Sequence, residues 1–305
     1  MKKKIFWLLI SSLCLMTVVF AEISQPEFTL TILHTNDFHG ASMEMLAKRA
    51  TLIKQIRAEG DKVLLVDAGD VFARGPYAKR FYGELEFAVM NQLHYDVMVL
   101  GNNEFKATGD ERARKILYDR IEQAKFPILG GNLMAMETKI IPKGIKPYVI
   151  LKVSGIQVGI IGLTSTKPNN YAQFKGWKVA KPSTTLTTIL PEVKQKSEVV
   201  LALTHIGFKD DKKLARLGQG LTAIIGGDSH TLLLKPVVVN GIPIVQAGSE
   251  GEFLGRLDLT LQKTEAGWKL LRFEGKMLDL KQVVPDPEIE KLINEFLKQL
   301  LPNAA

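Results

Sequence analysis

Five short segments of the sequence place carboxylate, imidazole or amide side chains directly after runs of apolar residues. Each segment alone is typical of an ordinary turn, because Asp, Asn and Gly favour turns. Five of them in one chain indicate a shared site with oxygen and nitrogen ligands, which suit divalent transition metals. The segments are Asp37-Phe38-His39, Gly69-Asp70, Gly101-Asn102-Asn103-Glu104, Thr204-His205 and Gly226-Gly227-Asp228-Ser229-His230.

The candidate ligands in these segments are three of the five histidines, three aspartates and one asparagine. Seven ligands are more than one tetrahedral ion needs, and they suit two ions that share a carboxylate. Ions about 3.5–4 Å apart cleave phosphoesters, because they clamp the attacking and leaving oxygens and generate hydroxide at neutral pH. The candidates are Asp37, His39, Asp70, Asn102, His205, Asp228 and His230, and we interpret His34 and His94 as packed or solvated.

The apolar runs before the five segments are predicted to be buried strands, because both of their faces are apolar and β-branched residues are frequent. Predicted helices lie between them at Met45–Ala58, Glu84–Leu93 and Asp110–Ala124. This alternation predicts an α/β protein, in which ligands bind at the carboxyl ends of the strands. The runs are Phe28–Leu33, Val63–Val66, Val97–Leu100, Val199–Leu203 and Thr222–Ile225, and a sixth predicted strand is Val158–Ile161.

The pattern changes after about Lys235, where strands follow one another through short turns. Asn240-Gly241 is a strong hairpin signal, and the segment from Asp286 to Leu300 has the pattern of an amphipathic helix. We therefore expect an α/β part followed by a β-meander, with two stacked sheets in a single domain. The predicted strands are Val237–Val239, Ile242–Gln246, Arg256–Gln262 and Trp268–Glu274.

The first 21 residues have the parts of a secretory signal peptide. Three lysines, Lys2 to Lys4, precede an apolar run from Ile5 to Phe20, and Ala21 is a small residue before Glu22. An uncleaved anchor is the alternative, although this run is shorter than the about 20 residues that span a bilayer. We expect a periplasmic or secreted protein that has no contact with the membrane after cleavage.

The composition is that of a globular protein, with 46% hydrophobic and 24% charged residues over 305 positions. Without the leader and its three lysines, 284 residues remain and the formal charge falls from +8 to +5. The surplus is spread along the chain, so we expect no nucleic-acid partner. The only cysteine, Cys14, lies in the leader, where it could be lipidated. The mature chain, residues 22–305, therefore has no thiolate metal site.

In this order, the five segments resemble the motifs of calcineurin-like metallophosphoesterases. The similarity is greatest to the N-terminal domain of secreted 5'-nucleotidases and 2',3'-cyclic phosphodiesterases. Residues 33–40 (LHTNDFHG), 67–72 (DAGDVF) and 245–248 (VQAG) support it. The resemblance covers almost the whole mature chain and implies a four-layer αββα sandwich of two mixed sheets in a single domain.

The resemblance also implies how two divalent ions would be held. Asp37, His39 and His230 would bind one ion, and Asp70 would bridge. The second ion would lie between Asn102, His205 and Asp228. These ligands suit Zn, Mn, Fe or Co, and the sequence does not choose among them.

The chain departs from the family pattern at two catalytic positions. Asn103 stands where the family has a histidine that assists the leaving group, and Lys106 stands where that histidine has an aspartate partner. An asparagine can donate a hydrogen bond to a phosphoryl oxygen but cannot act as a general acid. Lys106 could bind phosphate or protonate a leaving oxygen, or it could be a solvated surface lysine.

Two further departures concern the metal and the substrate. Asp228 replaces a family histidine, which would favour harder ions such as Mn²⁺. The chain also stops at the predicted final helix, where the family has a linker to a C-terminal nucleotide-binding domain. We therefore expect no such domain here, and a partner chain could supply substrate recognition instead.

Two functions follow from these observations. The resemblance implies a secreted dinuclear-metal phosphoester hydrolase of the 5'-nucleotidase type, weakened by the loss of the acid. Its substrates would be phosphomonoesters or cyclic phosphodiesters, nucleotides among them. The alternative is a catalytically degenerate protein that binds metal and phosphate on the same scaffold.

Overall fold

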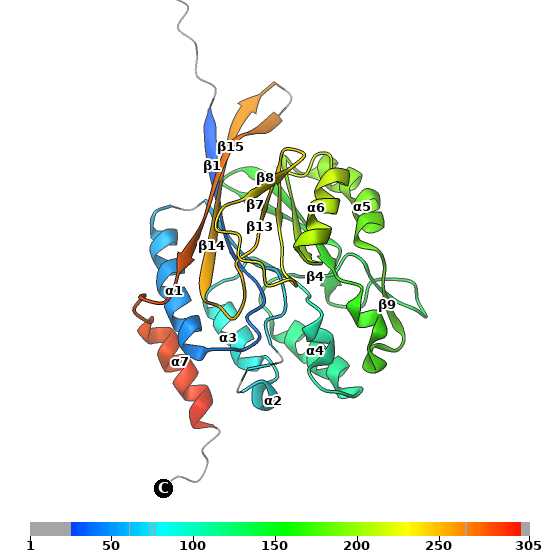
Figure 1. Ribbon diagram of the computed structural model, residues 1–305, viewed down its shortest axis with the longest axis vertical. Coiled ribbons are helices and arrows are strands. Elements are labelled where there is room, and N and C mark those ends of the chain that lie inside the picture. Colours follow the sequence, from blue (N-terminus) through cyan, green and yellow to red (C-terminus); the bar gives the residue numbers. More distant parts are fainter. Residues whose placement is uncertain (1–25, 61, 73, 76, 266, 300–305) are drawn as a thin grey trace, which may run out of the picture.

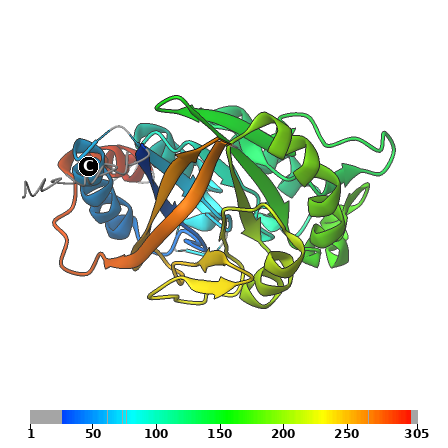
Figure 2. The same cartoon turned by 90° about the horizontal axis from the view of Figure 1, so that it is seen from above.

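Two β-sheets lie face to face between two outer layers of helices in the computed structural model (Figures 1 and 2). The structure describes residues 26–299 except 61, 73, 76 and 266, so the predicted leader and Cys14 lie outside the described residues. In that part of the chain, no helix is long and apolar enough to cross a membrane.

The first sheet has seven strands in the order β15-β14-β1-β2-β3-β4-β6. The five strands from β1 to β6 run parallel, whereas β14 is antiparallel to both of its neighbours. The bounds are β1 Glu27–Thr35, β2 Val63–Asp67, β3 Val97–Val99, β4 Ile128–Leu129, β6 Ile145–Lys146, β14 Phe253–Thr264 and β15 Gly267–Asp279.

The second sheet has six strands in the order β12-β13-β11-β10-β8-β7, and only its two edge pairs are antiparallel. A separate two-stranded ribbon joins β5 and β9. The bounds are β7 Tyr148–Val153, β8 Ile156–Thr164, β10 Val199–His205, β11 Ala223–Ile225, β12 Val237–Val239, β13 Ile242–Val245, β5 Leu133–Ala135 and β9 Trp177–Val179.

The helices form the two outer layers, and their apolar faces cover the sheets. The first sheet is covered by α1 Met43–Ala58, α2 Ala78–Phe81, α3 Glu84–Gln92, α4 Arg112–Gln123 and α7 Pro287–Lys298. The second sheet is covered by α5 Pro182–Lys196 and α6 Phe208–Leu217. Short 3-10 helices lie at η1 Asn103–Lys106, η2 Lys167–Asn170 and η3 Ala172–Phe174.

Three buried apolar clusters fill the spaces between the four layers. Alternation along the strands produces them, because successive side chains of a strand point to opposite faces. In β10, Leu201 and Leu203 pack between the sheets, whereas Val200 and Ala202 pack against α5 and α6. Burial on both faces explains why these strands have no polar alternation in the sequence.

The strands after Lys235 differ from the predicted meander. The β12–β13 hairpin turns at Asn240-Gly241, as predicted, with left-handed φ angles of 53° and 78°, and it extends the second sheet. The β14–β15 hairpin instead joins the first sheet beside β1. The prediction of one meander is therefore wrong, because each hairpin completes the edge of a different parallel sheet.

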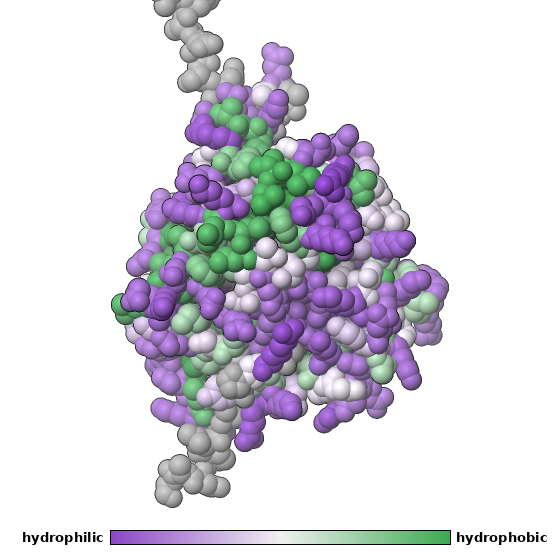
Figure 3. All heavy atoms as spheres, viewed as in Figure 1, coloured by the Kyte–Doolittle hydropathy of each residue, from purple (hydrophilic) through white to green (hydrophobic). Residues whose placement is uncertain are grey.

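The face shown in Figure 3 is mainly polar, but apolar side chains gather in its upper part, over the region of β14 and β15. Strand β15 is the outermost strand of the first sheet, and Leu271 on it is 46% exposed. The free edge of the first sheet is thus partly apolar.

Candidate metal centre

All seven candidate ligands lie at the carboxyl ends of strands or in the loops that follow them. Three strands of the first sheet and two of the second contribute: β1 leads to Asp37 and His39, β2 to Asp70, and β3 to Asn102. In the second sheet, His205 ends β10, and Asp228 and His230 follow β11. The site therefore lies where the ends of the two sheets meet.

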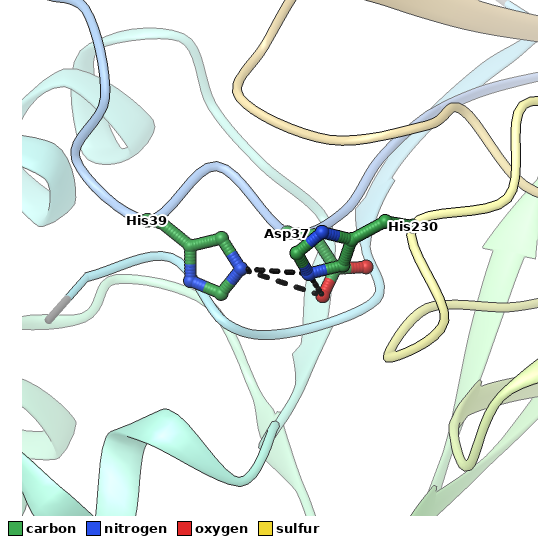
Figure 4. Close-up of side chains that lie close together, drawn as sticks. All are labelled: Asp37, His39 and His230. Carbon is green, nitrogen blue, oxygen red and sulfur yellow. Dashed lines mark hydrogen bonds and ion pairs between the residues drawn. The ribbon is translucent and has the colours of Figure 1, made fainter. Parts of the chain in front are cut away.

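The structure brings five of these residues into two groups whose ligand atoms lie within 4.8 Å of one another. We call Asp37, His39 and His230 the His230 group (Figure 4). We call Asp37, Asp70 and His205 the His205 group. Asp37 is common to both groups, and the assignment of the bridging role to Asp70 stays a prediction.

The three side chains of the His230 group face a common point. The Nε2 atoms of His39 and His230 are 3.0 Å apart, and Asp37 Oδ1 lies 3.4 Å from His230 Nε2 and 3.8 Å from His39 Nε2 (Figure 4). Two imidazole nitrogens and a carboxylate oxygen at one point form a ligand set of the kind that binds zinc and similar ions.

The His205 group is completely buried, and one of its nitrogens has no protein partner. His205 Nδ1 donates to the carbonyl oxygen of Ala68 at 2.7 Å, so Nε2 is the ring nitrogen that faces the site. That Nε2 atom lies 3.3 Å from Asp70 Oδ2 and 4.0 Å from Asp37 Oδ1. Both His205 Nε2 and Asp37 Oδ1 are buried without a hydrogen-bond partner. Buried polar atoms are rarely left unpaired, so a bound cation fits these residues.

The electrostatics of the pocket also favour a cation. Burial lowers the pKa of His205, but the nearby carboxylates of Asp70, Asp37 and Asp228 outweigh it and raise this pKa well above its usual value. Burial raises the pKa of Asp70, yet the charge of His205 and hydrogen bonds to the carboxylate bring it down to about 2. Three carboxylates thus surround His205 Nε2 and favour a positive charge at this point, which a divalent ion would also supply.

Five of the seven candidate ligands have left-handed backbone conformations. The φ angles are 51° at Asp37, 58° at His39, 60° at Asp70, 79° at Asp228 and 54° at His230. Such conformations cost about 1–3 kcal/mol each and persist only where the surroundings impose them. Backbone hydrogen bonds between the loops do this here, because Asp37 N donates to Gly69 O and His39 N donates to Asp70 O.

Glycine is required where these loops approach one another. A Cβ atom on Gly69, whose φ is 89°, would lie 2.5 Å from the backbone nitrogen of Gly101. A Cβ atom on Gly227 would lie 2.9 Å from His205 Nδ1. Side chains at these positions would push the ligand loops apart.

Three buried polar side chains hold the ligand loops in place. Asn36 Nδ2 donates to Asp37 Oδ2 at 2.8 Å and to Gly248 O at 2.7 Å. Gln246 Oε1 accepts from the hydroxyl of Ser229 at 2.8 Å. Glu104 accepts from the backbone nitrogens of Asp70, Val71 and Gly101. Sequence reasoning gave none of them a role, although all three lie in or beside the motif segments.

Asn103 and Lys106 occupy different environments. Asn103 is fully buried, and its Nδ2 donates to Asp70 Oδ2 at 2.6 Å and lies 3.2 Å from His39 Nδ1. The ammonium of Lys106 lies 5.2 Å from the centroid of the Tyr171 ring. The amide of Asn103 is therefore engaged by two candidate ligands.

Asp228 belongs to neither group and instead faces a lysine that the sequence did not single out. Lys167 Nζ lies 2.5 Å from Asp228 Oδ1. The same oxygen accepts from the Asn102 amide at 2.8 Å in the hydrogen-bonded orientation of that amide. Lys167 follows β8, the predicted strand that had no candidate ligand after it, so no motif pointed to it.

The calcineurin-like phosphoesterase family matches residues 30–232, a span that contains every candidate ligand. The chain belongs to this family. Calcineurin-like phosphoesterases with solved structures share the fold, and that of YfkN from Bacillus subtilis superimposes with a TM-score of 0.78. This match has 26% identity and covers 90% of this chain and 98% of that one.

Curated relatives of this calcineurin-like phosphoesterase are nucleotide phosphoesterases by name. The chain is 33% identical to the trifunctional nucleotide phosphoesterase protein YfkN of Bacillus subtilis, over 77% of this chain and 18% of that protein. It is 31% identical to snake venom 5'-nucleotidase of Naja atra, over 90% of this chain and 58% of that protein. The chain thus spans less than two thirds of the length of either relative.

Proposed function

We propose that this protein is a dinuclear-metal phosphoester hydrolase of the 5'-nucleotidase type. The observation that carries the proposal is the pair of buried, unpartnered atoms, Asp37 Oδ1 and His205 Nε2, at the junction of two candidate ligand groups. The family match supports hydrolysis of phosphoesters as the reaction.

The proposed ligands divide between two ions. Asp37, His39 and His230 would hold the first, Asn102, His205 and Asp228 would hold the second, and Asp70 would be shared by both. Bound divalent ions of Zn, Mn, Fe or Co supply Lewis-acid activation of the phosphoryl group and of the attacking water. The oxygen ligand at Asp228 favours a hard ion such as Mn²⁺.

The proposed reaction lacks a strong general acid. Asn103 has no titratable proton, and its amide already donates to Asp70. Help from a general acid contributes about 10²–10⁴-fold, so esters with good leaving groups are the better substrates. If leaving-group departure is too slow, the chain acts instead as a metal- and phosphate-binding protein on this scaffold.

The proposed substrates are phosphomonoesters or cyclic phosphodiesters, with nucleotides favoured by the names of the relatives. The lysine-rich start and apolar run of residues 1–21 support export, which would place the protein in the periplasm or outside the cell.

The test measures hydrolysis of p-nitrophenyl phosphate, bis-p-nitrophenyl phosphate and 5'-AMP by metal-free protein to which Mn²⁺ or Zn²⁺ is returned. We expect metal-dependent hydrolysis of the activated esters that is lost in Asp70→Asn and kept in Asp110→Asn, an exposed control. Fewer than one ion bound per chain would contradict both functions. Two bound ions without hydrolysis would favour the binding protein.

A further inference from the structure

We infer that Lys167 acts as an internal cation that competes with the second metal ion for Asp228. The inference rests on the proposed function, since it concerns how that site fills. It assigns the His230 group to a tightly held ion and the Asp228 side of the site to a weaker, exchangeable one.

The contact between Lys167 and Asp228 is close and lies at the mouth of the site. Lys167 Nζ is 2.5 Å from Asp228 Oδ1, and the Asp228 side chain is only 9% exposed. The lysine side chain is 55% exposed, so its ammonium can leave towards solvent without unfolding η2. A long, flexible lysine stem makes this movement easy.

Asp228 Oδ1 is the oxygen that a second ion would need. It lies 3.6 Å from His205 Nε2, which is itself unpartnered, and it accepts from the Asn102 amide. Turning that amide by 180° would place the Asn102 oxygen opposite Asp228 Oδ1, as two ligands of one cation require. An entering ion must therefore displace an ammonium and turn an amide.

The His230 group has no lysine or arginine in contact with its carboxylate, and the positive charge of Arg74 acts on His39 and His230 from farther away. Among the described residues, no lysine or arginine nitrogen lies within 4.0 Å of the Asp37 carboxylate. The charged groups within that distance of Asp37 are the imidazoles of the three site histidines. Contact with an ammonium on the Asp228 side alone therefore predicts two sites of unequal affinity. A positive charge a few ångströms from a divalent ion weakens its binding, by roughly tenfold or more where solvent is partly excluded.

The experiment titrates the metal-free protein with Mn²⁺ by calorimetry and counts bound ions after gel filtration. We expect two sites in the natural sequence whose dissociation constants differ by about tenfold or more. Lys167→Met should tighten the weaker site by a similar factor and leave the tighter site unchanged. Lys167→Arg retains the charge and should keep the weak site, and Lys209→Met, an exposed lysine on α6, should match the natural protein.

Unchanged or weaker binding at the second site in Lys167→Met would overturn the inference, as would two equal sites in the natural protein. These results would not contradict the proposed function if hydrolysis still depends on metal. Absence of bound ions and of hydrolysis in every variant would instead remove the proposed function, and the inference with it.

Discussion

The side chain at position 103 contacts two of the proposed metal ligands. The amide of Asn103 donates to Asp70 Oδ2 at 2.6 Å and contacts His39, so it helps to orient two proposed ligands. A histidine at this position could carry a proton to a leaving oxygen, which an amide cannot do. In the proposed reaction, Asn103 therefore orients the ligands but supplies no acid.

The double variant Asn103→His, Lys106→Asp should therefore raise activity on poor leaving groups. We expect hydrolysis of 5'-AMP to increase by about 10²–10⁴-fold, the usual contribution of a general acid. Hydrolysis of p-nitrophenyl phosphate should change by less than about tenfold, because its leaving group needs no proton. Steady-state kinetics on both esters, with Lys106→Asp alone as control, test this. No gain on 5'-AMP would show that the pocket lacks more than its acid.

His34 is fully buried and has no hydrogen-bond partner at either ring nitrogen. Burial lowers the pKa of His34 from 6.5 to about 3. The folded protein keeps this ring neutral, whereas the unfolded chain takes up a proton below about pH 6.5. The contribution of neutral His34 to the free energy of unfolding is therefore fully present above pH 6.5. It is lost as the pH falls towards 3, by at most about 1.4 kcal/mol per pH unit.

Replacing His34 by leucine should remove this component of the pH dependence. The difference in unfolding free energy between His34→Leu and the natural protein should be constant above pH 7 and should grow in favour of the variant between pH 6 and pH 4.5. Urea denaturation at several pH values measures it, and His94→Gln, an exposed histidine, is the control. A difference that does not vary with pH would contradict the argument.

At the scale of elements, the final helix α7 shows how a terminal segment is fixed to the fold. It packs against α1 and α3, with Ile289 and Ile293 buried. Asp286 caps it, because Oδ1 accepts from the backbone nitrogens of Glu288 and Ile289, each at 3.1 Å. Its other oxygen lies 2.7 Å from Lys54 Nζ, on α1.

The cap and the ion pair can be separated by two substitutions. Asp286→Ala removes both and should lower the free energy of unfolding by about 1–2 kcal/mol. Asp286→Asn keeps an acceptor for the helix and should lose only about 0.2–1 kcal/mol, the usual value of a partly exposed ion pair. Urea denaturation measures both effects, with Glu290→Gln as the control. Equal losses in the two variants would mean that the charge, and not the cap, stabilises the helix.

The sequence predicts all five strands that lead to the candidate ligands, and it misses the two-residue strands β4 and β6. Runs such as Val199–Leu203 are recognisable because both faces are buried, whereas β4 and β6 have two residues each and show no pattern. The positions of the candidate ligands could be predicted because these residues follow recognisable strands. The contact of Lys167 with Asp228 could not, because it joins loops 61 positions apart and no local spacing encodes it.

For the molecule as a whole, the proposed centre joins two sheets that also pack through an apolar cluster and through hydrogen bonds such as that of His205 to Ala68. Asp37, His39, Asp70 and Asn102 come from the first sheet, and His205, Asp228 and His230 come from the second. An ion that needs ligands from both sheets binds the folded chain and not the unfolded one. Its binding energy therefore adds to the stability of the sandwich.

Metal should accordingly protect the protein against heat. Mn²⁺ at about 100 times its dissociation constant stabilises a folded state by about 2.7 kcal/mol, which corresponds to a rise in Tm of several degrees. Calorimetry with added Mn²⁺ and with EDTA measures the shift. Asp37→Asn changes the residue that the His230 group and the His205 group share, and it should abolish most of the rise in Tm with Mn²⁺. A Tm that changes neither with Mn²⁺ nor with EDTA would contradict a metal centre that joins the two sheets.

The antiparallel pairing of β14 with β1 has a consequence for how the chain can be divided. The family match ends at residue 232, yet β14 pairs with every residue of β1 from Glu27 to His34, and Gln246 holds the loop that carries Asp228 and His230. A fragment ending at 232 would leave β1 as a bare edge, open to pairing with other chains. The smallest part able to fold alone is thus larger than the part that family similarity recognises, and trimming to the matched region should yield aggregates.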